Sequence, residues 1–194
     1  PVTDRIHARF NLAGTATGRM SCNNPNLQQV PRGAEFRSLF AAPKGRAFVI
    51  ADYNAMELRC AAHVAGEETL LEAFQNKADP HALTAAMLLD KTPEAWEAMD
   101  AGDRKQAQAS YGVAISEDKA RQYRAMWFKA YPAFTRWHAK AGATAKKTLM
   151  VRTPGGRVRM WSDPEKFRET YAYNTPIQGA GAEAILAALG SLMP

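Results

Sequence analysis

The alternation of apolar and polar positions along the chain predicts short strands and several helices. Residues 47–53, Ala-Phe-Val-Ile-Ala-Asp-Tyr, form a short apolar run that is typical of a buried strand. A helical period follows over 55–64, where Leu58 and the pair Ala61–Ala62 are the expected core positions. Residues 1–35 are rich in Asn, Gly, Thr and Pro without a clear period, and they predict short strands and loops.

Capping residues mark the starts of further helices. Asp79-Pro80 and Thr92-Pro93 each place an N-cap residue before a proline at the first helical position. Ser116 is another N-cap residue, and Tyr131-Pro132 interrupts the helical period that follows it. The expected helices run over 80–89, from 116 to about 130, over 133–148 and after Pro176.

Residues 149–161 predict a β-hairpin. Two short apolar stretches flank Pro154-Gly155-Gly156, a combination that favours a tight turn. Since most other segments have a helical period, the pattern as a whole predicts an α+β fold that is mostly helical.

Length and composition restrict the class of protein. The chain has 194 residues, of which 46% are hydrophobic and 23% are charged, so it suits one domain or one lobe of a larger one and is too apolar for intrinsic disorder. The sequence contains no run of 18 apolar residues, so we expect no transmembrane helix. The first five residues do not resemble a signal peptide. Cys22 and Cys60 are too few for a disulfide framework or a four-cysteine zinc site. We therefore expect a cytoplasmic protein with free thiols that does not contact a membrane.

The positive charge is concentrated in one part of the sequence. The net charge is +6, but residues 104–168 hold 15 Lys and Arg against four acidic residues, a net of +11 that leaves −5 for the rest. Such a segment predicts that a polyanion binds along it. A solvated basic helix face is an equally open interpretation.

Asp52 is the first candidate for chemistry. It ends the apolar run, and a carboxylate at the end of a buried strand needs a charge partner because desolvation alone is costly. A divalent cation such as Mg²⁺, which takes one or two carboxylates with water and phosphate oxygens, is one such partner. The alternative is that Asp52 caps the next helix.

Four blocks of the sequence share a resemblance to one enzyme family. Residues 49–59 read Val-Ile-Ala-Asp-Tyr-Asn-Ala-Met-Glu-Leu-Arg, and this stretch resembles motif A of family A, polymerase I-like, DNA polymerases. Residues 15–31 resemble its primer-side segment, 79–85 the start of a fingers helix, and 174–179 the palm segment at the template–primer minor groove. The blocks lie in the family's order with compatible spacing, so the resemblance covers almost the whole chain.

The resemblance implies part of a right-handed polymerase fold. A palm, which is a small antiparallel sheet with helices, would contain the primer-side segment and motif A in residues 1–65. Helical fingers would follow over 66–150, and the chain would return to the palm over 151–194. The fold would be incomplete.

The resemblance also implies template-directed addition of dNTPs to a primer 3′ end by two-metal nucleotidyl transfer. Asp52 would be one of two aspartates that bind the Mg²⁺ pair, for which Mn²⁺ can substitute, and the Tyr53 carbonyl would be a further ligand. Glu57 would pack against the sugar of the incoming nucleotide and exclude a 2′-hydroxyl; its alternative is a surface salt bridge to Arg59. The nucleotide would be bound by Tyr53, Glu57, His81 and Arg104, of which the last two would hold the triphosphate unless they are exposed helix residues.

Six residues would bind primer–template DNA by the same resemblance. Amide side chains suit minor-groove contacts, because the acceptors there look alike for all base pairs and shape can be checked without sequence. The alternatives are a turn residue for Asn26 and a polar residue at a helix N-terminus for Gln178. The six are Arg19, which would enter the minor groove at the primer terminus, Asn26, Gln28, Arg59, Asn174 and Gln178. The protein would act as a monomer. Whether it binds a processivity factor stays open.

Two departures from the family stand out. Asp103–Ala107 begins the helix of motif B, but the residues from Gln108 resemble the segment after that helix, so its lysine and aromatic residue are missing and Tyr111 is expected to be a packing residue. The His-Asp-Glu hairpin of motif C does not appear before Pro194. The numbered chain is then either the ordered part of a longer polypeptide or a non-catalytic remnant left by deletion.

Other function classes are weighed against the polymerase. The leading alternative is a DNA-binding polymerase-like module without activity, in which Trp137 and Trp161 could be core or base-stacking residues while Trp127 is expected in the core. Glu57 argues against a single-subunit RNA polymerase relative, and the absence of a carboxylate cluster around Asp52 argues against a nuclease. A bacterial cell, a phage-infected cell and an organelle all remain open as settings.

Overall fold

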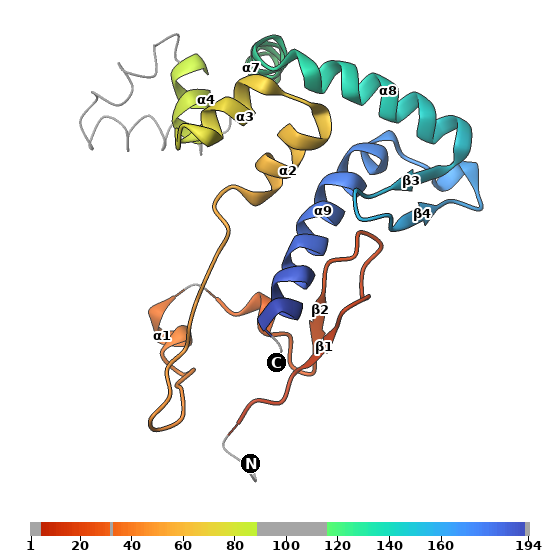
Figure 1. Cartoon of the computed structure of the whole chain (residues 1–194). Helices are drawn as coiled ribbons and strands as arrows, with labels where there is room; N and C mark the ends of the chain where they lie inside the picture. Colours follow the sequence, from red (N-terminus) through yellow and green to blue (C-terminus); the bar gives the residue numbers. More distant parts are fainter. Residues whose placement is uncertain (1–4, 32, 89–115, 193–194) are drawn as a thin grey trace. The chain divides into compact units, whose positions relative to one another are not determined.

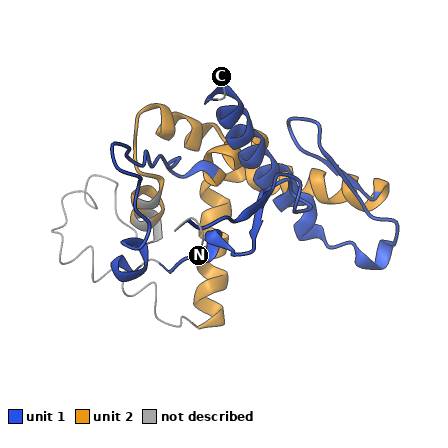
Figure 2. Cartoon of the chain, turned by 90° about the horizontal axis from the view of Figure 1, so that it is seen from below, with its two compact units in different colours: residues 1–56, 149–194 blue, residues 57–148 orange. Residues whose placement is uncertain are grey.

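The chain divides into two compact units. The computed structural model describes residues 5–31, 33–88 and 116–192. Unit 1 consists of Pro1–Met56 and Leu149–Pro194, and unit 2 of Glu57–Thr148 (Figure 2). Unit 1 is therefore built from both ends of the sequence and unit 2 from its middle. Helices and small antiparallel sheets together confirm the predicted α+β class.

The first part of unit 1 contains the short strands and loops that its composition predicts. Strands β1 (Arg9–Asn11) and β2 (Ser21–Asn23) pair antiparallel, with Phe10 opposite Cys22. The short helices η1 (Leu27–Gln29) and α1 (Ala34–Arg37) follow.

The predicted hairpin is confirmed in the second part of unit 1. Strands β3 (Met150–Arg152) and β4 (Val158–Met160) pair antiparallel, with Val151 opposite Arg159. The Gly156 N–H donates to the Thr153 carbonyl at 3.0 Å, and Gly156 has a φ of +92°, which glycine adopts without steric cost. The short helix η2 (Pro164–Lys166) comes next.

Helix α9 (Glu169–Leu192) is longer than expected. It begins before Pro176, so the prediction that the last helix follows this proline is wrong. Proline removes one backbone donor from a helix interior, and it is tolerated where packing on both sides outweighs that loss. Such packing is present, since α9 contacts β3 and lies beside the hairpin (Figure 1). Its buried residues are Ala172, Thr175, Pro176, Gly179, Gly181 and Ala182.

Unit 2 is helical in its described part. The predicted helices over 55–64, from Pro80, from 116 to 130 and over 133–148 are confirmed, and Thr92-Pro93 lies outside the described residues. Ser116 caps its helix as expected, since its hydroxyl accepts the Lys119 N–H at 3.3 Å. The helices are α2 (Met56–Ala65), α3 (Glu68–Gln75), α4 (Pro80–Leu88), α7 (Glu117–Ala130) and α8 (Pro132–Thr148).

The core of unit 2 is formed by large apolar side chains. Leu70 and Phe134 are 1% and 2% exposed. Trp127, which we expect in the core, is half-buried with its ring centroid 4.8 Å from that of Phe134. The buried carboxylate of Glu67 accepts the Ala133 N–H at 2.9 Å and so caps the first turn of α8 from 66 residues away. Ala61 and Ala62 are buried as expected, and Leu58 is half-buried.

The prediction of a buried strand over 47–53 is wrong for this structure. The segment has no regular secondary structure, and Val49 and Ile50 are 94% and 88% exposed. A strand needs a neighbouring strand that satisfies its backbone N–H and carbonyl groups. Within the part of the chain that the structure describes, the strand pairs are β1 with β2 and β3 with β4, so nothing pairs with this segment.

The chain passes between the two units twice, and a non-glycine residue with positive φ lies at each passage. Ala55, with φ +50°, precedes the first boundary by two residues, and Leu149, with the same φ, follows the second. Left-handed backbone costs an L-residue roughly 1–2 kcal/mol. Both connections are therefore strained. None of the helices over the described ranges is long and apolar enough to span a bilayer.

Candidate nucleic-acid interface

The loop of residues 15–19 in unit 1 is held by its own hydrogen bonds. The Gly18 N–H donates to the Thr15 carbonyl at 3.1 Å, and the Thr15 hydroxyl donates to the Arg19 carbonyl at 3.0 Å. Gly18 has a φ of +87°, where a side chain would be strained. The exposed side chain of Arg19 is thus carried by an ordered turn.

Asn26 and Gln28 have local contacts that fix their places. The Asn26 Oδ1 atom accepts the Gln28 N–H at 3.0 Å and caps η1. This is the local contact that we expect of Asn26 as a turn residue. The Gln28 Nε2 atom donates to the Met20 carbonyl at 3.1 Å. Both residues are exposed, so two amide side chains stand at fixed positions on the surface of unit 1.

Asn174 and Gln178 lie one helical turn apart on α9. Residues four positions apart share one side of a helix. Asn174 is exposed and Gln178 half-buried. Because α9 already begins at Glu169, the interpretation of Gln178 as a residue at a helix N-terminus is wrong.

Thr175 and Gly179, which directly follow Asn174 and Gln178, pack against other parts of unit 1. Thr175 is fully buried, and its hydroxyl accepts a hydrogen bond from Arg159 Nη1 at 3.3 Å. At Gly179, a Cβ would overlap Thr153 Cγ2 and lie 3.4 Å from the Thr17 carbonyl oxygen. Helix α9 therefore touches both the hairpin and the loop of residues 15–19 at the position next to Gln178.

The loop also touches the hairpin. A Cβ on Gly18 would lie 2.6 Å from Arg157 Nε, and that Nε is buried without a hydrogen-bond partner among the described residues. The structure thus brings the predicted segments of Arg19 and Gln178 together inside unit 1, with the hairpin against both.

Arg159 is enclosed by aromatic rings. Its guanidinium carbon lies 4.2 Å from the ring centroid of Tyr171 and 4.8 Å from that of Trp161. The two rings are parallel, with centroids 5.7 Å apart, and Trp161 also contacts Phe167 edge-on. Cation–π contacts of this kind hold the arginine in place. Trp161 is therefore a packing residue of the hairpin in this structure.

Sequence reasoning missed Arg157, Arg159 and the acidic residue Glu183 of α9. A signal for Arg159 exists, because side chains directly opposite each other on paired strands point to one face. Val151, opposite Arg159, is buried, so that face is the inner one. Recognising the inner face requires knowledge of which strand face α9 covers.

Asp52 and Tyr53 lie in the segment that forms no strand, and both are exposed. The argument that a buried carboxylate needs a charge partner therefore does not hold for Asp52 here. Met56, the last residue of the first part of unit 1, lies close to α9, since a Cβ on Gly181 would lie 3.3 Å from Met56 Sδ.

The metal donors in this segment are few. No group of three or more His, Cys, Asp and Glu residues that could hold a metal occurs over the described ranges. A carboxylate beside a backbone carbonyl is nevertheless an oxygen donor set that Mg²⁺ accepts when phosphates and water complete the shell. Asp52 with Tyr53 fits one part of such a site.

Glu57 and Arg59 belong to unit 2, on α2. The guanidinium carbon of Arg59 lies 4.2 Å from the ring centroid of Phe74. Glu57 is exposed in the first turn of the helix. The pKa of the Cys60 thiol is raised, first by burial and second by the negative charge of the Glu57 carboxylate. The Glu57 carboxylate therefore lies near Cys60, three residues further along α2.

The predicted triphosphate ligands are only partly described. His81 is the second residue of α4, close to a helix start as expected, and its side chain is outside the described part. Arg104 and Tyr111 lie wholly outside the described residues.

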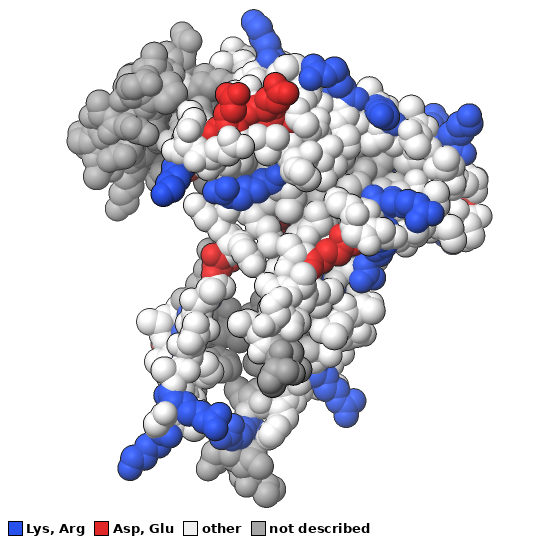
Figure 3. Space-filling model, viewed as in Figure 1, with Lys and Arg blue, Asp and Glu red and all other residues white. Residues whose placement is uncertain are grey.

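The basic segment divides between the two units. Residues 116–168 contain 13 Lys and Arg against four acidic residues. In unit 2, Lys and Arg side chains spread along α7 and α8, and acidic side chains gather over α3 (Figure 3). Two acids are paired, Glu117 with Arg121 at 2.5 Å and Asp163 with Lys166 at 3.5 Å. Exposed salt bridges of this kind contribute little to the stability of the fold. Residues 116–168 still have a positive net charge.

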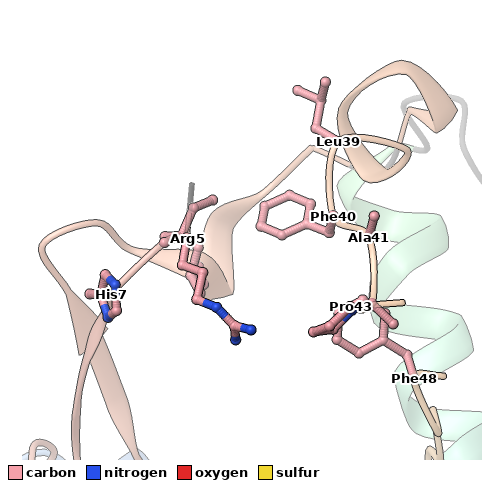
Figure 4. A pocket seen from close by; sticks show the side chains of 10 residues that line it. Arg5, His7, Leu39, Phe40, Ala41, Pro43 and Phe48 are labelled. Atoms are coloured by element: carbon pink, nitrogen blue, oxygen red, sulfur yellow. The ribbon is translucent and has the colours of Figure 1, made fainter. Parts of the chain in front are cut away.

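A separate hollow of about 630 Å³ lies in unit 1. It is lined mainly by apolar side chains such as Phe40 and Phe48, and the Arg5 side chain extends into the space between them and His7 (Figure 4). None of the predicted site residues lines this hollow. Leu27, which lines the hollow, lies between Asn26 and Gln28 in the sequence, so the hollow borders the segment that carries these two amides.

Comparisons with known proteins agree with the motifs. The family model for DNA polymerase family A matches residues 1–193. DNA polymerase I of Chloroflexus aurantiacus is 36% identical over 213 residues, which cover 97% of this chain and 22% of that protein. The thermostable DNA polymerase I of Thermus thermophilus is 33% identical over 219 residues, which cover 100% of this chain and 26% of that protein.

A solved structure matches the fold as well. The POL domain of Pol1 from M. smegmatis, in complex with DNA primer-template and dNTP, superposes with a TM-score of 0.77 and 28% identity over 96% of this chain and 37% of that chain. The chain spans about a quarter of the length of the curated relatives named above.

The alignment with the Thermus protein extends over 219 positions, 25 more than the chain has residues. The relative therefore has residues inside the matched region for which this chain has no counterpart. With a family model over nearly every residue, four motifs in order and the same fold in a solved polymerase domain, the chain belongs to DNA polymerase family A.

Proposed function

We propose that this protein is a template-directed DNA polymerase that adds deoxynucleotides to a primer 3′ end. The observation that carries the proposal is the meeting, inside unit 1, of the loop before Arg19 with α9 beside Gln178. Two segments far apart in the sequence converge there, each with exposed or half-exposed side chains that suit minor-groove contacts. The family and the DNA-bound structural neighbour support the substrate class.

Unit 1 would serve as the palm surface under the primer–template. Arg19 would insert into the minor groove, where a guanidinium is favoured electrostatically. The amides of Asn26, Gln28, Asn174 and Gln178 would contact base edges and sugars, since an amide can donate to the acceptors that every base pair presents. Their local anchoring, described above, reduces the entropy lost on binding.

Asp52 and the Tyr53 carbonyl would hold magnesium. Two magnesium ions, or manganese in their place, would supply activation of the primer 3′-hydroxyl and stabilisation of the pyrophosphate leaving group. Because Asp52 is exposed, it can reach ions that arrive with the nucleotide.

Unit 2 would contribute the fingers and the nucleotide site. Glu57 would lie against the sugar of the incoming nucleotide, and His81 and Arg104 would bind its triphosphate. Arg59, whose guanidinium stacks on Phe74, would contact DNA phosphate. The protein would act as a monomer on primer–template DNA and dNTPs.

A second candidate is a polymerase-like module that binds DNA without extending a primer. The specific observation in its favour is the difference of 25 positions between the Thermus alignment and the chain. A loss of the phosphate-binding lysine and the aromatic residue of motif B would remove nucleotide contacts while leaving the duplex surface intact.

Primer extension by the full-length protein separates these candidates. Extension by the wild type supports the polymerase, and tight primer–template binding without extension supports the module. Asp52→Ala should reduce extension by at least about a thousandfold, as expected for loss of a metal ligand, and change the Kd for DNA by less than about threefold. Asp163→Ala, which also removes one acid, is the matched control and should extend normally. If Asp52→Ala extends normally, Asp52 is not a ligand.

A further inference from the structure

Glu183 joins helix α9 to the turn of the β3–β4 hairpin. Its Oε2 atom accepts the Gly155 N–H at 2.8 Å, and its Oε1 atom accepts the hydroxyl proton of Thr153. A Cβ on Gly155 would lie 2.5 Å from Glu183 Oε2, so the turn approaches the carboxylate as closely as glycine allows. One side chain thus binds two donors of a turn that lies 28 and 30 residues earlier in the chain.

The Thr153 hydroxyl also closes the turn itself. Its oxygen accepts the Arg157 N–H at 3.0 Å, while the Thr153 N–H donates to the Arg157 carbonyl at 2.9 Å. Thr153 is 5% exposed, so the hydroxyl has little access to water. Its proton goes to Glu183, and the carboxylate is therefore part of the hydrogen bonding of the turn.

Three contacts with the hairpin are spaced by four residues along α9. Thr175 bonds Arg159, Gly179 touches Thr153, and Glu183 bonds the turn. Positions spaced by four form one row on a helix. This row fixes the rotation of α9 about its own axis.

Asn174 and Gln178 each precede one residue of this row. One residue along a helix corresponds to a rotation of about 100°, so the two amides form a neighbouring row whose direction is set by the first. A rotation of α9 by even a fraction of that angle would carry both amides away from a bound duplex together.

We propose that Glu183 is a positioning residue for primer–template binding. By anchoring the hairpin turn to α9 it holds the helix in the rotation at which Asn174 and Gln178 face the minor groove. This inference rests on the proposed function, in which those two amides contact DNA. It assigns to Glu183 no contact with DNA or nucleotide.

A double-mutant cycle in the full-length protein tests the proposal. The Kd for a labelled primer–template is measured by fluorescence anisotropy for Gln178→Ala, Glu183→Ala and the double variant. Each single change should weaken binding about tenfold, and the double variant should be no more than about twofold weaker than either, because Glu183→Ala has already displaced Gln178. Factors that multiply to about a hundredfold would show that Glu183 and Gln178 act on binding independently, and that result would overturn the inference.

The same cycle distinguishes failure of the proposed function. If Gln178→Ala and Asn174→Ala both leave the Kd unchanged, the minor-groove contacts themselves are absent, and the inference falls with them. If those variants weaken binding but Glu183→Ala does not, only the role of Glu183 is overturned.

Rescue by a conservative variant completes the test. In Glu183→Gln the amide oxygen can accept the Gly155 N–H while the amide nitrogen donates to the Thr153 hydroxyl, so binding should stay within about twofold of the wild type. Glu183→Leu, similar in size without acceptors, should behave like Glu183→Ala. A charge effect predicts the opposite sign, because loss of an acid beside a polyanion strengthens binding.

Two variants guard against loss of folding. Glu165→Ala removes an exposed acid of the segment before α9 and should bind DNA normally. If circular dichroism shows that Glu183→Ala does not fold, Thr153→Val replaces it in the cycle, since valine keeps the shape and removes the hydroxyl. Multiplying factors for Thr153→Val and Gln178→Ala would then contradict the proposal.

Discussion

The two units differ in which residues they bury. Unit 2 buries large side chains such as Leu70, Phe74 and Phe134 between its helices. Unit 1 buries small or polar ones, such as Thr153, Thr175 and Ala182. Every large hydrophobic residue that is exposed in the described part of the chain lies in unit 1, from Ile6 to Leu192.

This difference indicates two ways of holding a structure together. Unit 2 is stabilised mainly by apolar area removed from water. Unit 1 depends on a few specific contacts, among them Glu183 with the hairpin turn and Arg159 with Thr175. A surface built from anchored polar groups suits recognition of a ligand, whereas a packed helical core suits a rigid support.

The largest expected effect compares one aromatic residue from each unit. Phe134→Ala should destabilise the protein by about 3–5 kcal/mol, because it empties a packed core position. Phe48→Ala, at a residue 62% exposed, should change stability by less than about 0.5 kcal/mol. Urea unfolding followed by tryptophan fluorescence measures both. Equal losses would show that unit 1 buries Phe48 after all.

A second pair of variants tests the close approach between α9 and the hairpin. Gly179→Ala should destabilise the protein by roughly 1–3 kcal/mol, since its Cβ has no room beside Thr153. Gly190→Ala on the same helix meets no atom within 4 Å and should stabilise it by roughly 0.5–1 kcal/mol through helix propensity. Thermal unfolding measures whether each variant is more or less stable than the wild type. If Gly179→Ala leaves the stability unchanged, the hairpin can move away from α9.

A smaller effect concerns the connection between the units. Ala55→Gly should stabilise the protein by roughly 0.5–1 kcal/mol, because glycine adopts positive φ without strain. Ala143→Gly, at an exposed position inside α8, should instead cost about 1 kcal/mol. Should both changes destabilise equally in urea unfolding, Ala55 does not hold a left-handed conformation in solution.

The smallest effect is a pH dependence in unit 2. Burial first, and the Arg124 guanidinium second, lower the pKa of His138 below its ordinary value of 6.5. The unfolded state then binds a proton that the folded state does not, so stability falls as pH drops below 6.5 and levels off beneath the folded-state pKa. His138→Gln should flatten this slope, which urea unfolding at a series of pH values measures. An unchanged slope in His138→Gln would assign the dependence to other groups.

Much of the secondary structure follows from local sequence signals. Ser116 caps α7 and Pro154-Gly155-Gly156 forms the hairpin turn, because a cap or a turn involves residues only a few positions apart. Asn174 and Gln178, which the family motifs single out, both lie on α9. They are one turn apart on a helix, as their spacing of four allows.

The tertiary structure decided the remainder. Residues 47–53 have a strand pattern, yet a strand forms only where another strand is available to pair with it, and such a partner is a non-local property. Pro176 reads as a helix start, but the contacts of its neighbours with the hairpin keep α9 continuous through it. The link from Glu183 to Thr153 and Gly155 spans about 30 positions of the chain, so no local pattern could have revealed it. The sequence by itself determined the family and the elements that rest on local signals; which faces meet, and whether residues 47–53 find a partner strand, was decided by packing between distant segments.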